Sequence, residues 1–393
     1  MAIRLNARGH NFGLADRVTA VATTSAVMPI EARKDYVLVA EKFGDFAEPE
    51  AHIGYAAIVT TDSLPDGWNG ATAVMSQLSE VSHIRQGHVV YIDPVSKLVR
   101  VVYRPESPNN TIFATDRCNS NCLMCSQPPK DVDDSYLVQH NLRMISLIKG
   151  GPPSVGITGG EPTLLGDGLI RILTALRDEW SNTYVHMLTN GRNYAEPALV
   201  NAIADVRHPN FVSAVPLYAD VPEVHDYVVQ AKGAFWETLD GLYNAAEAGL
   251  RIEIRVVLHK QTLPRLGKLV EFIYRNLPFV EHVALMGLEH MGYVKKNWDT
   301  LWIDPIEYKS DLRSAVEYLH HRGMHVSVYN LPLCLVDRDI HSFAQKSISD
   351  FKNIYLPECE GCTVMEHCSG VFSSWENRHS ANIRPYLETL SPT

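Results

Sequence analysis

The sequence predicts an α/β protein: a partial barrel of six βα units over residues 109–325, between a β-rich region (1–108) and a small cysteine-containing region (326–393). Three observations predict this organisation. Short apolar runs alternate with helical patterns in the middle of the chain, which is typical of a parallel sheet. The first region shows alternating apolar runs with weak helical periodicity. Towards the last region the alternation stops: a short strand, His325–Tyr329, leads to Cys334, and further cysteines follow.

Composition places the chain among ordinary globular proteins. It has 393 residues, 46% of them hydrophobic and 20% charged, and at ~150 residues per domain this length predicts two or three domains. The net charge of −10 disfavours nucleic acid as a partner. No run approaches the ~18 apolar residues of a membrane span, and the N-terminus lacks an apolar signal-peptide core. We therefore expect a cytoplasmic protein with no membrane partner.

The N-terminal region contains one clear hairpin. The runs His88–Ile92 and Leu98–Tyr103 flank the turn Asp93–Lys97. We predict a small, mostly antiparallel β domain that ends in the polar, turn-rich segment Pro105–Asn110. A peptide strand could add to an exposed edge of such a domain, which would give it a role in peptide recognition.

The middle region contains six candidate strands separated by helical segments. Helical patterns end at Gly249 and at Gly323, and the second begins with Asp304 as N-cap and Pro305 at the first position. Such a sheet could be open and doubly wound or a curved part-barrel. The predicted strands are Thr111–Thr115, Ser154–Thr158, Tyr184–Leu188, Val212–Leu217, Ile252–Leu258 and His282–Met286.

Polar motifs at successive strand ends favour the barrel. A cysteine-rich loop follows the first predicted strand, Gly159–Glu161 follows the second, and Thr189–Gly191 follows the third. In parallel βα barrels the carboxyl ends of the strands meet at one face, where the active site lies. We therefore expect these motifs to surround a single centre.

The seven cysteines fall into two spaced groups. The first is Cys118, Cys122 and Cys125, a Cys-x3-Cys-x2-Cys pattern. An odd number of cysteines in a reducing compartment argues against disulfides, and thiolates close together in a loop are typical of a metal centre. Three thiolates on a four-iron cluster leave one iron open to an external chelator, such as the amino and carboxylate groups of a methionyl moiety. Zinc, which takes four closed ligands, is the alternative.

The second group is Cys359, Cys362 and Cys368, and Cys334 stands 25 residues before it. These four thiolates could close an iron–sulfur cluster completely. Zinc is a stronger rival here, because four cysteines also form structural zinc sites, and His367 could replace one of them. We expect this centre to hold the C-terminal region together, since the region has little apolar core of its own.

The middle region resembles the radical S-adenosylmethionine (SAM) superfamily. The resemblance covers roughly residues 111–290 and rests on Cys118-Asn119-Ser120-Asn121-Cys122-Leu123-Met124-Cys125 and Gly159-Gly160-Glu161, each after a predicted strand. It implies a TIM-like partial barrel whose three cysteines hold a catalytic [4Fe–4S] cluster. The residue before the third cysteine is often aromatic in this superfamily. Here it is Met124, which can still give an apolar contact to adenine.

The resemblance also implies roles for residues at other strand ends. Gly159–Glu161 would hold the methionine amino group of SAM. Ser213 would contact the ribose or the carboxylate, Arg255 would face the carboxylate, and Met286, within Leu285–Gly287, would present its backbone to the adenine. The alternatives are a plain strand hydroxyl for Ser213 and a structural ion pair for Arg255. No side chain is assigned as catalytic.

The C-terminal cysteines resemble the auxiliary-cluster extension, of the SPASM or shorter twitch type, of peptide-modifying radical SAM enzymes. The full SPASM pattern has seven cysteines, so the four of this group imply one auxiliary [4Fe–4S] cluster. The segments Asn119–Pro129, Pro216–Asp220 and His225–Tyr227 resemble the HxsC-type maturases of the His-Xaa-Ser repeat peptide system.

We therefore expect an enzyme that cleaves SAM to a 5′-deoxyadenosyl radical and abstracts hydrogen from a ribosomally made peptide. Both clusters together use all seven cysteines, which leaves no free thiol to return a hydrogen atom and favours an oxidative cross-link. The expected partners are the precursor peptide, an electron donor such as flavodoxin or ferredoxin, and a second maturase. The alternatives are a peptide epimerase, a radical SAM enzyme acting on RNA or a small molecule, and a non-catalytic iron–sulfur or zinc-binding adaptor.

Overall fold

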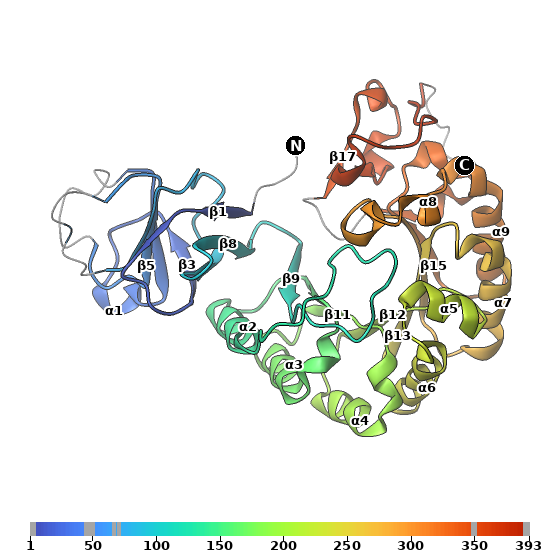
Figure 1. The fold of residues 1–393 in the computed structure, drawn as a ribbon, viewed down its shortest axis with the longest axis horizontal. Helices are drawn as coiled ribbons and strands as arrows, with labels where there is room; N and C mark the ends of the chain where they lie inside the picture. Colours follow the sequence, from blue (N-terminus) through green and yellow to red (C-terminus); the bar gives the residue numbers. More distant parts are fainter. Residues whose placement is uncertain (1–4, 43–51, 65–67, 69–71, 347–351, 388–393) are drawn as a thin grey trace.

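The computed structural model describes residues 5–42, 52–64, 68, 72–346 and 352–387. Within these residues the strands form two eight-stranded sheets and one two-stranded sheet. Figure 1 shows the N-terminal sheet beside one end of a curled central sheet and the C-terminal segment beside the other end. In the part of the chain that is described, no helix is long and apolar enough to cross a membrane.

The N-terminal sheet is mixed. β1, β8, β7 and β3 pair antiparallel, β3 to β6 pair parallel, and β2 runs antiparallel to β6. The predicted hairpin is confirmed as β7 and β8, whereas the parallel pairings were not foreseen. The elements are β1 (Asn6–Arg8), β2 (His10–Phe12), β3 (Val18–Thr23), α1 (Ile30–Arg33), β4 (Tyr36–Ala40), β5 (Ala57–Thr60), β6 (Val74–Ser76), β7 (Val89–Asp93) and β8 (Leu98–Tyr103).

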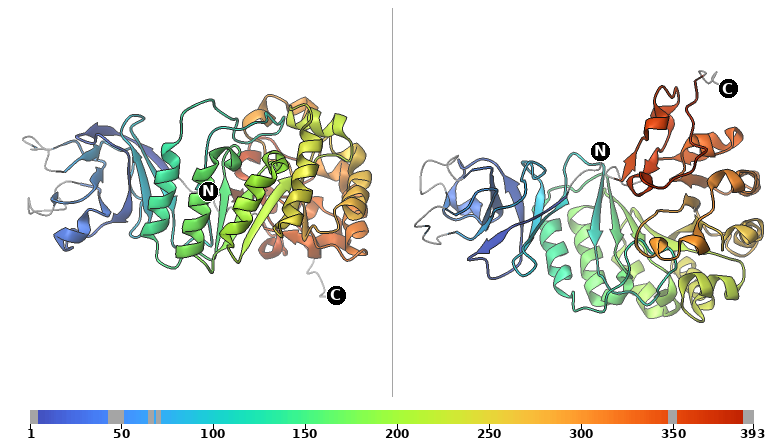
Figure 2. Two further views of the ribbon diagram at one scale, coloured as in Figure 1. Left: turned by 90° about the horizontal axis from the view of Figure 1, so that it is seen from below. Right: turned by 45° about the horizontal axis from the view of Figure 1, so that its top comes forward.

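The central sheet is parallel throughout, and its strands lie in chain order from β9 to β16. It curls into a half-barrel (Figure 2), which confirms the predicted α/β fold. Two strands beyond residue 325 extend the six that the sequence predicts. The strands are β9 (Asn109–Phe113), β10 (Ser154–Thr158), β11 (Tyr184–Leu188), β12 (Phe211–Pro216), β13 (Arg251–Leu258), β14 (His282–Gly287), β15 (Val326–Tyr329) and β16 (Ala344–Gln345).

Helices cover the outer face of the half-barrel (Figure 1), and buried apolar side chains such as Ile157, Leu173 and Leu242 fill the space between helices and sheet. The predicted start at Asp304 is confirmed: this residue forms a capping box with Glu307 at the turn that leads into α9. The helices are α2 (Tyr136–Leu147), α3 (Asp167–Glu179), α4 (Pro197–Val206), α5 (Pro222–Val229), α6 (Ala234–Glu247), α7 (Leu266–Asn276), α8 (Trp298–Leu301) and α9 (Lys309–His320).

The C-terminal segment is rich in loops and short 3₁₀ turns. Its strands β17 (Asn353–Ile354) and β18 (Val371–Phe372) pair antiparallel. The indole N–H of Trp375 donates to the Leu288 carbonyl over 3.0 Å, and the ring of His290 stacks on Trp375 with 4.6 Å between centroids. These contacts fix the segment on the loop that follows β14.

Three buried histidines and the half-buried His140 predict that the fold is sensitive to acid. Burial lowers the pKa of His140, His225 and His290 to about 4 and that of His259 to about 3, from an ordinary value of 6.5. The unfolded chain therefore binds more protons below pH 6.5, so the folded state loses stability as the pH falls from there towards 4. We expect a lower urea midpoint of unfolding at pH 5.5 than at pH 7.5, and a smaller difference in His259→Gln. Equal midpoints in the parent protein would contradict this.

Candidate functional site

A cavity of about 720 Å³ runs along the concave face of the half-barrel. All three parts of the chain line it. Tyr91 and Arg100 come from the N-terminal sheet, the strand ends of the half-barrel form the middle, and Lys352 and Phe372 come from the C-terminal segment. A cavity of this size is in the range of small-molecule and cofactor sites.

Cys118, Cys122 and Cys125 follow β9, and all three line this cavity. Burial raises the pKa of Cys118 to about 11 and that of Cys122 to about 12, and charge on the neighbouring thiols adds to both shifts. The three cysteines of the sequence-predicted group thus share one loop at the cavity wall, although no three His, Cys, Asp or Glu side chains in the described part of the chain are placed to hold one metal ion. Thiols that resist ionisation when alone become thiolates when a metal compensates their charge, so this soft donor set fits an iron–sulfur cluster.

The glycines of the second motif pack directly against the start of the cysteine loop. Gly160 N–H donates to the Thr115 carbonyl over 2.7 Å, and Glu161 N–H donates to the Arg117 carbonyl over 2.8 Å. A Cβ on Gly160 would stand 2.0 Å from the Arg117 carbonyl oxygen. Gly159 has φ +139°, a backbone conformation that side chains rarely adopt. Only glycine allows these two loops to approach so closely.

Glu161 is fully buried, and protein donors occupy its carboxylate. One oxygen accepts from the Thr163 N–H at 3.0 Å and from the hydroxyls of Thr163 and Thr189 at 2.6 and 2.7 Å, and the other accepts from the Asn190 N–H at 2.6 Å. Burial raises the pKa of Glu161, and these hydrogen bonds act in the opposite direction. The carboxylate therefore joins the strand-end loops after β10 and β11.

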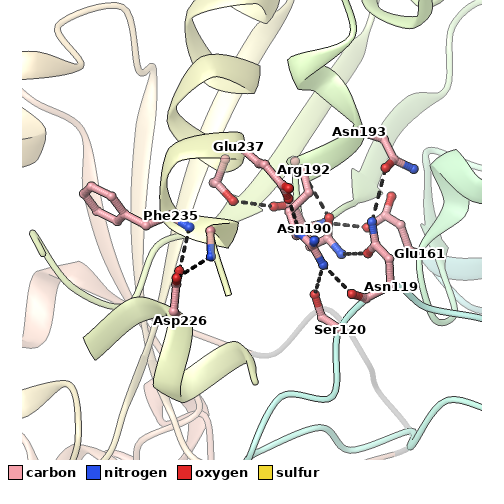
Figure 3. A network of polar contacts seen from close by, with 12 residues as sticks. Asn119, Ser120, Glu161, Asn190, Arg192, Asn193, Asp226, Phe235 and Glu237 are labelled. Atoms are coloured by element: carbon pink, nitrogen blue, oxygen red, sulfur yellow. Dashed lines mark hydrogen bonds and ion pairs between the residues drawn. The ribbon is translucent and has the colours of Figure 1, made fainter. Parts of the chain in front are cut away.

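Asn190 and Arg192 tie the end of β11 to the cysteine loop (Figure 3). The Asn190 amide donates to Asn119 Oδ1 at 2.5 Å and lies 3.9 Å from Cys118 Sγ. The Arg192 guanidinium donates to the Asn119 carbonyl and to Ser120 Oγ. Sequence reasoning noted the Thr189–Gly191 motif but missed Arg192, for which adjacency to that motif was the only signal.

The predicted SAM-contacting residues divide between the cavity and the core. Met124, Arg255 and Met286 line the cavity, and the Arg255 guanidinium donates to Met286 Sδ at 3.0 and 3.2 Å. Ser213 does not line it. Its hydroxyl is fully buried and lies 2.8 Å from the Tyr194 hydroxyl, in the layer between sheet and helices. Ser213 therefore lies away from the cavity where its predicted contact to SAM would form, and its hydroxyl hydrogen-bonds to Tyr194.

Glu253 is the centre of a polar network inside the half-barrel that sequence reasoning missed. Its carboxylate is 3.2 Å from His186 Nε2 and 2.8 Å from His282 Nδ1, and it lies 3.7 Å from Arg255. Burial alone would raise the pKa of Glu253, but the imidazole hydrogen bonds and the Arg255 charge hold it far below its ordinary value. The ionised carboxylate therefore helps to fix Arg255 at the cavity wall, which agrees with the ion-pair alternative for this residue.

The C-terminal cysteines lie near enough to one another for their charges to interact. Burial raises the pKa of Cys334 to about 11, and charge on Cys368 and Cys359 adds to the shift. Burial also raises the pKa of Cys359 and Cys368, and charge on Cys362 adds to both shifts. His367 is exposed. Among the described residues, no three His, Cys, Asp or Glu side chains stand close enough to share a single metal ion.

Backbone N–H groups donate hydrogen bonds to two sulfurs of this second group. Leu333 and Gly370 donate to Cys368 Sγ over 3.3 and 3.4 Å, and Tyr386 donates to Cys362 Sγ over 3.4 Å. Hydrogen bonds to ligating sulfurs stabilise the thiolate form and tune the potential of iron–sulfur clusters. The environment of these cysteines therefore fits an iron–sulfur cluster, as does that of the first group.

Comparison with known proteins gives matches that cover part of this chain. A probable GTP 3′,8-cyclase of Sulfurisphaera tokodaii is 26% identical over 220 residues, which cover 55% of this chain and 65% of that protein. The Fe-coproporphyrin III synthase of Methanosarcina barkeri is 28% identical over 153 residues, which cover 38% of this chain and 36% of that protein. The chain thus spans about two thirds or less of these curated relatives.

Among solved structures, SuiB of Streptococcus suis bound to S-adenosylmethionine matches with a TM-score of 0.47 and 16% identity, over 63% of this chain and 55% of that chain. The protein anSMEcpe with bound AdoMet matches with a TM-score of 0.44 and 17% identity, over 56% and 62%. Residues 112–273 match the sequence model of the Radical SAM superfamily, and they include the cysteine loop and the Gly159–Glu161 motif. Over residues 112–273 this chain is therefore similar to the radical SAM superfamily.

Proposed function

We propose that this chain is a radical SAM enzyme that modifies a ribosomally made peptide and leaves an oxidative cross-link in it. The observation that carries the proposal is the convergence of Cys118, Cys122 and Cys125 on the cavity, beside the two glycines that pack against their loop. Three thiolates leave one iron of a four-iron cluster without a protein ligand, and SAM is the chelator that this family brings to such an iron.

The residues around the cavity have distinct parts in this proposal. When bound, the cluster and SAM supply the 5′-deoxyadenosyl radical. Cys118, Cys122 and Cys125 would hold the cluster. Gly159–Glu161 would shape the pocket for the SAM amino group, and Met124 and Met286 would offer apolar contacts to the adenine. Arg255, fixed by Glu253, would face the SAM carboxylate.

The C-terminal cysteines support net oxidation rather than epimerisation. In our proposal Cys334, Cys359, Cys362 and Cys368 hold one auxiliary [4Fe–4S] cluster of the SPASM or twitch type. After one hydrogen atom leaves the substrate carbon, bond formation to a second substrate group releases one proton and one electron. A cluster held by these four cysteines would supply the acceptor for that electron, and a flavodoxin or ferredoxin would be the electron donor for the first cluster. Resemblance of the cysteine loop to HxsC-type maturases supports a peptide substrate and a second maturase as partners.

Two other activities are each supported by one observation. The names of the curated relatives, a probable GTP 3′,8-cyclase and an Fe-coproporphyrin III synthase, favour a small-molecule substrate. Tyr218 is buried at the cavity wall. Burial raises the pKa of its hydroxyl, and charge on Cys122 and Cys125 adds to the shift. This tyrosine, beside the first group of cysteines, could return a hydrogen atom in a peptide epimerase. The mass of the product distinguishes both from a cross-link.

The first test is anaerobic reconstitution followed by reaction with dithionite and SAM. We expect a brown protein with about eight irons per chain, from two cubane clusters, and release of 5′-deoxyadenosine. A colourless protein that holds only zinc would contradict the proposal and support an adaptor.

The second test is co-expression with a short peptide encoded beside this chain, followed by mass spectrometry of the peptide. A loss of about two mass units is expected, because a cross-link removes two hydrogen atoms. An unchanged mass with altered chirality would indicate an epimerase, and an unmodified peptide together with a salt-sensitive RNA complex would indicate an RNA substrate.

A further inference from the structure

Arg192 joins three segments that lie far apart in the sequence. It follows β11, donates to the Asn119 carbonyl and to Ser120 Oγ of the cysteine loop, and donates to Glu237 Oε2 on α6 at 2.6 Å (Figure 3). These partners are 73, 72 and 45 residues away along the chain. Arg192 therefore fixes the cysteine loop against the body of the half-barrel.

The turn that carries Arg192 is itself rigidly placed. Gly191 has φ +76°, a left-handed conformation in which glycine is favoured. A Cβ on Gly241 of α6 would stand 2.2 Å from the Gly191 carbonyl oxygen, so the helix packs directly on this turn. The Arg192 N–H donates to Asn190 Oδ1 at 3.0 Å. The backbone of this turn and the ion pair with Glu237 therefore both orient the guanidinium towards the cysteine loop.

The charges of this ion pair are unequally buried. The Arg192 side chain is 15% exposed, whereas that of Glu237 is 43% exposed. Water screens the carboxylate more than the guanidinium, so the pair presents a net positive field to the loop. That field acts on the cysteine loop, because the guanidinium donates to Asn119 and Ser120, which lie between Cys118 and Cys122.

We propose that Arg192 is a positioning residue that holds the loop between Cys118 and Cys122 and raises the reduction potential of the cluster bound there. The inference rests on the proposed function, because it concerns the cluster that these cysteines hold. Reduction adds one negative charge to a cluster, and a nearby buried cation stabilises the reduced form more than the oxidised form. Arg192 therefore makes the cluster easier to reduce.

The test compares Arg192→Gln, Arg192→Lys and Glu237→Gln in reconstituted protein, by EPR-monitored redox titration and by the rate of iron loss to a chelator. Arg192→Gln should move the midpoint potential to more negative values, and Glu237→Gln should move it to less negative values. Arg192→Lys should keep the potential near that of the parent, because the charge remains. It should lose iron about 10-fold faster, because the forked contact to the loop is lost.

Arg265→Gln is the matched control. Arg265 forms an ion pair with Asp220 at 2.6 Å outside the cysteine loop, so the potential should not change. Shifts of the same sign in Arg192→Gln and Glu237→Gln, or no shift in either, would overturn the inference. If Arg192→Gln fails to fold, the midpoint potential of Glu237→Gln and the rate of iron loss from Arg192→Lys test the inference. Absence of any cluster from the parent protein would instead refute the proposed function.

Discussion

Replacement of Cys118, Cys122 or Cys125 with Ala is expected to abolish SAM cleavage, whereas Cys359→Ala should retain part of it. The three cysteines of the first group line the cavity and converge after β9. With only two thiolates left, the loop cannot hold a cubane cluster with one open iron. The measurement is 5′-deoxyadenosine released per chain in the presence of dithionite.

Iron content separates loss of chemistry from loss of folding in these variants. Cys118→Ala should retain the auxiliary cluster, which is about half of the iron of the parent, and Cys359→Ala should retain the other half. Circular dichroism shows whether each variant keeps its helices. Equal and complete loss of SAM cleavage from folded Cys118→Ala and Cys359→Ala would contradict the division of roles between the two groups.

Gly160→Ala is expected to cost about 1–3 kcal/mol of folding stability and to abolish SAM binding. The added methyl would stand 2.0 Å from the Arg117 carbonyl oxygen, a backbone atom at the start of the cysteine loop. Because backbone cannot rotate away as a side chain can, the two loops must separate, and the pocket beside the cysteines loses its shape. Urea unfolding and calorimetric titration of reconstituted protein with SAM measure the two effects.

Gly267→Ala is the matched control for this substitution. Gly267 lies in α7, and a Cβ there would meet nothing within 4 Å. Alanine in an exposed helical position should stabilise the protein by about 0.5–1 kcal/mol and leave SAM binding unchanged. Unchanged SAM affinity in Gly160→Ala would show that the close approach of the two loops does not shape the site.

Local patterns in the sequence were sufficient to predict the half-barrel and its cysteine loop. Ser154–Thr158 and Tyr184–Leu188 coincide with β10 and β11, since each is a short apolar run bounded by turn residues. The cysteine and glycine motifs are defined by spacings of a few residues, and such spacings can be recognised in a single sequence. The short strand predicted at His325–Tyr329 coincides with β15, but its pairing in the parallel sheet was missed, as was β16, because these strands have four and two residues and lack the βα pattern of the others.

Contacts between distant segments could not be predicted in this way. All but the last of the six residues of β12 are buried. No alternation of polar and apolar residues therefore distinguishes the cavity face of this strand from its helix face. For this reason Ser213 was predicted on the cavity face, whereas it lies on the helix face. Arg192 and Glu253 have partners on other strands and helices, tens of residues away. Their roles depend on tertiary packing, which the sequence does not display locally.

Electron–nuclear double resonance of the reduced protein, mixed with SAM labelled with ¹⁵N and ¹³C in its methionine part, tests the account most directly. We predict couplings from the amino nitrogen and the carboxylate carbon to a cluster that disappears in Cys122→Ala. A first cluster that is present but shows no coupling to bound SAM, because a fourth protein side chain completes its coordination, would contradict the account.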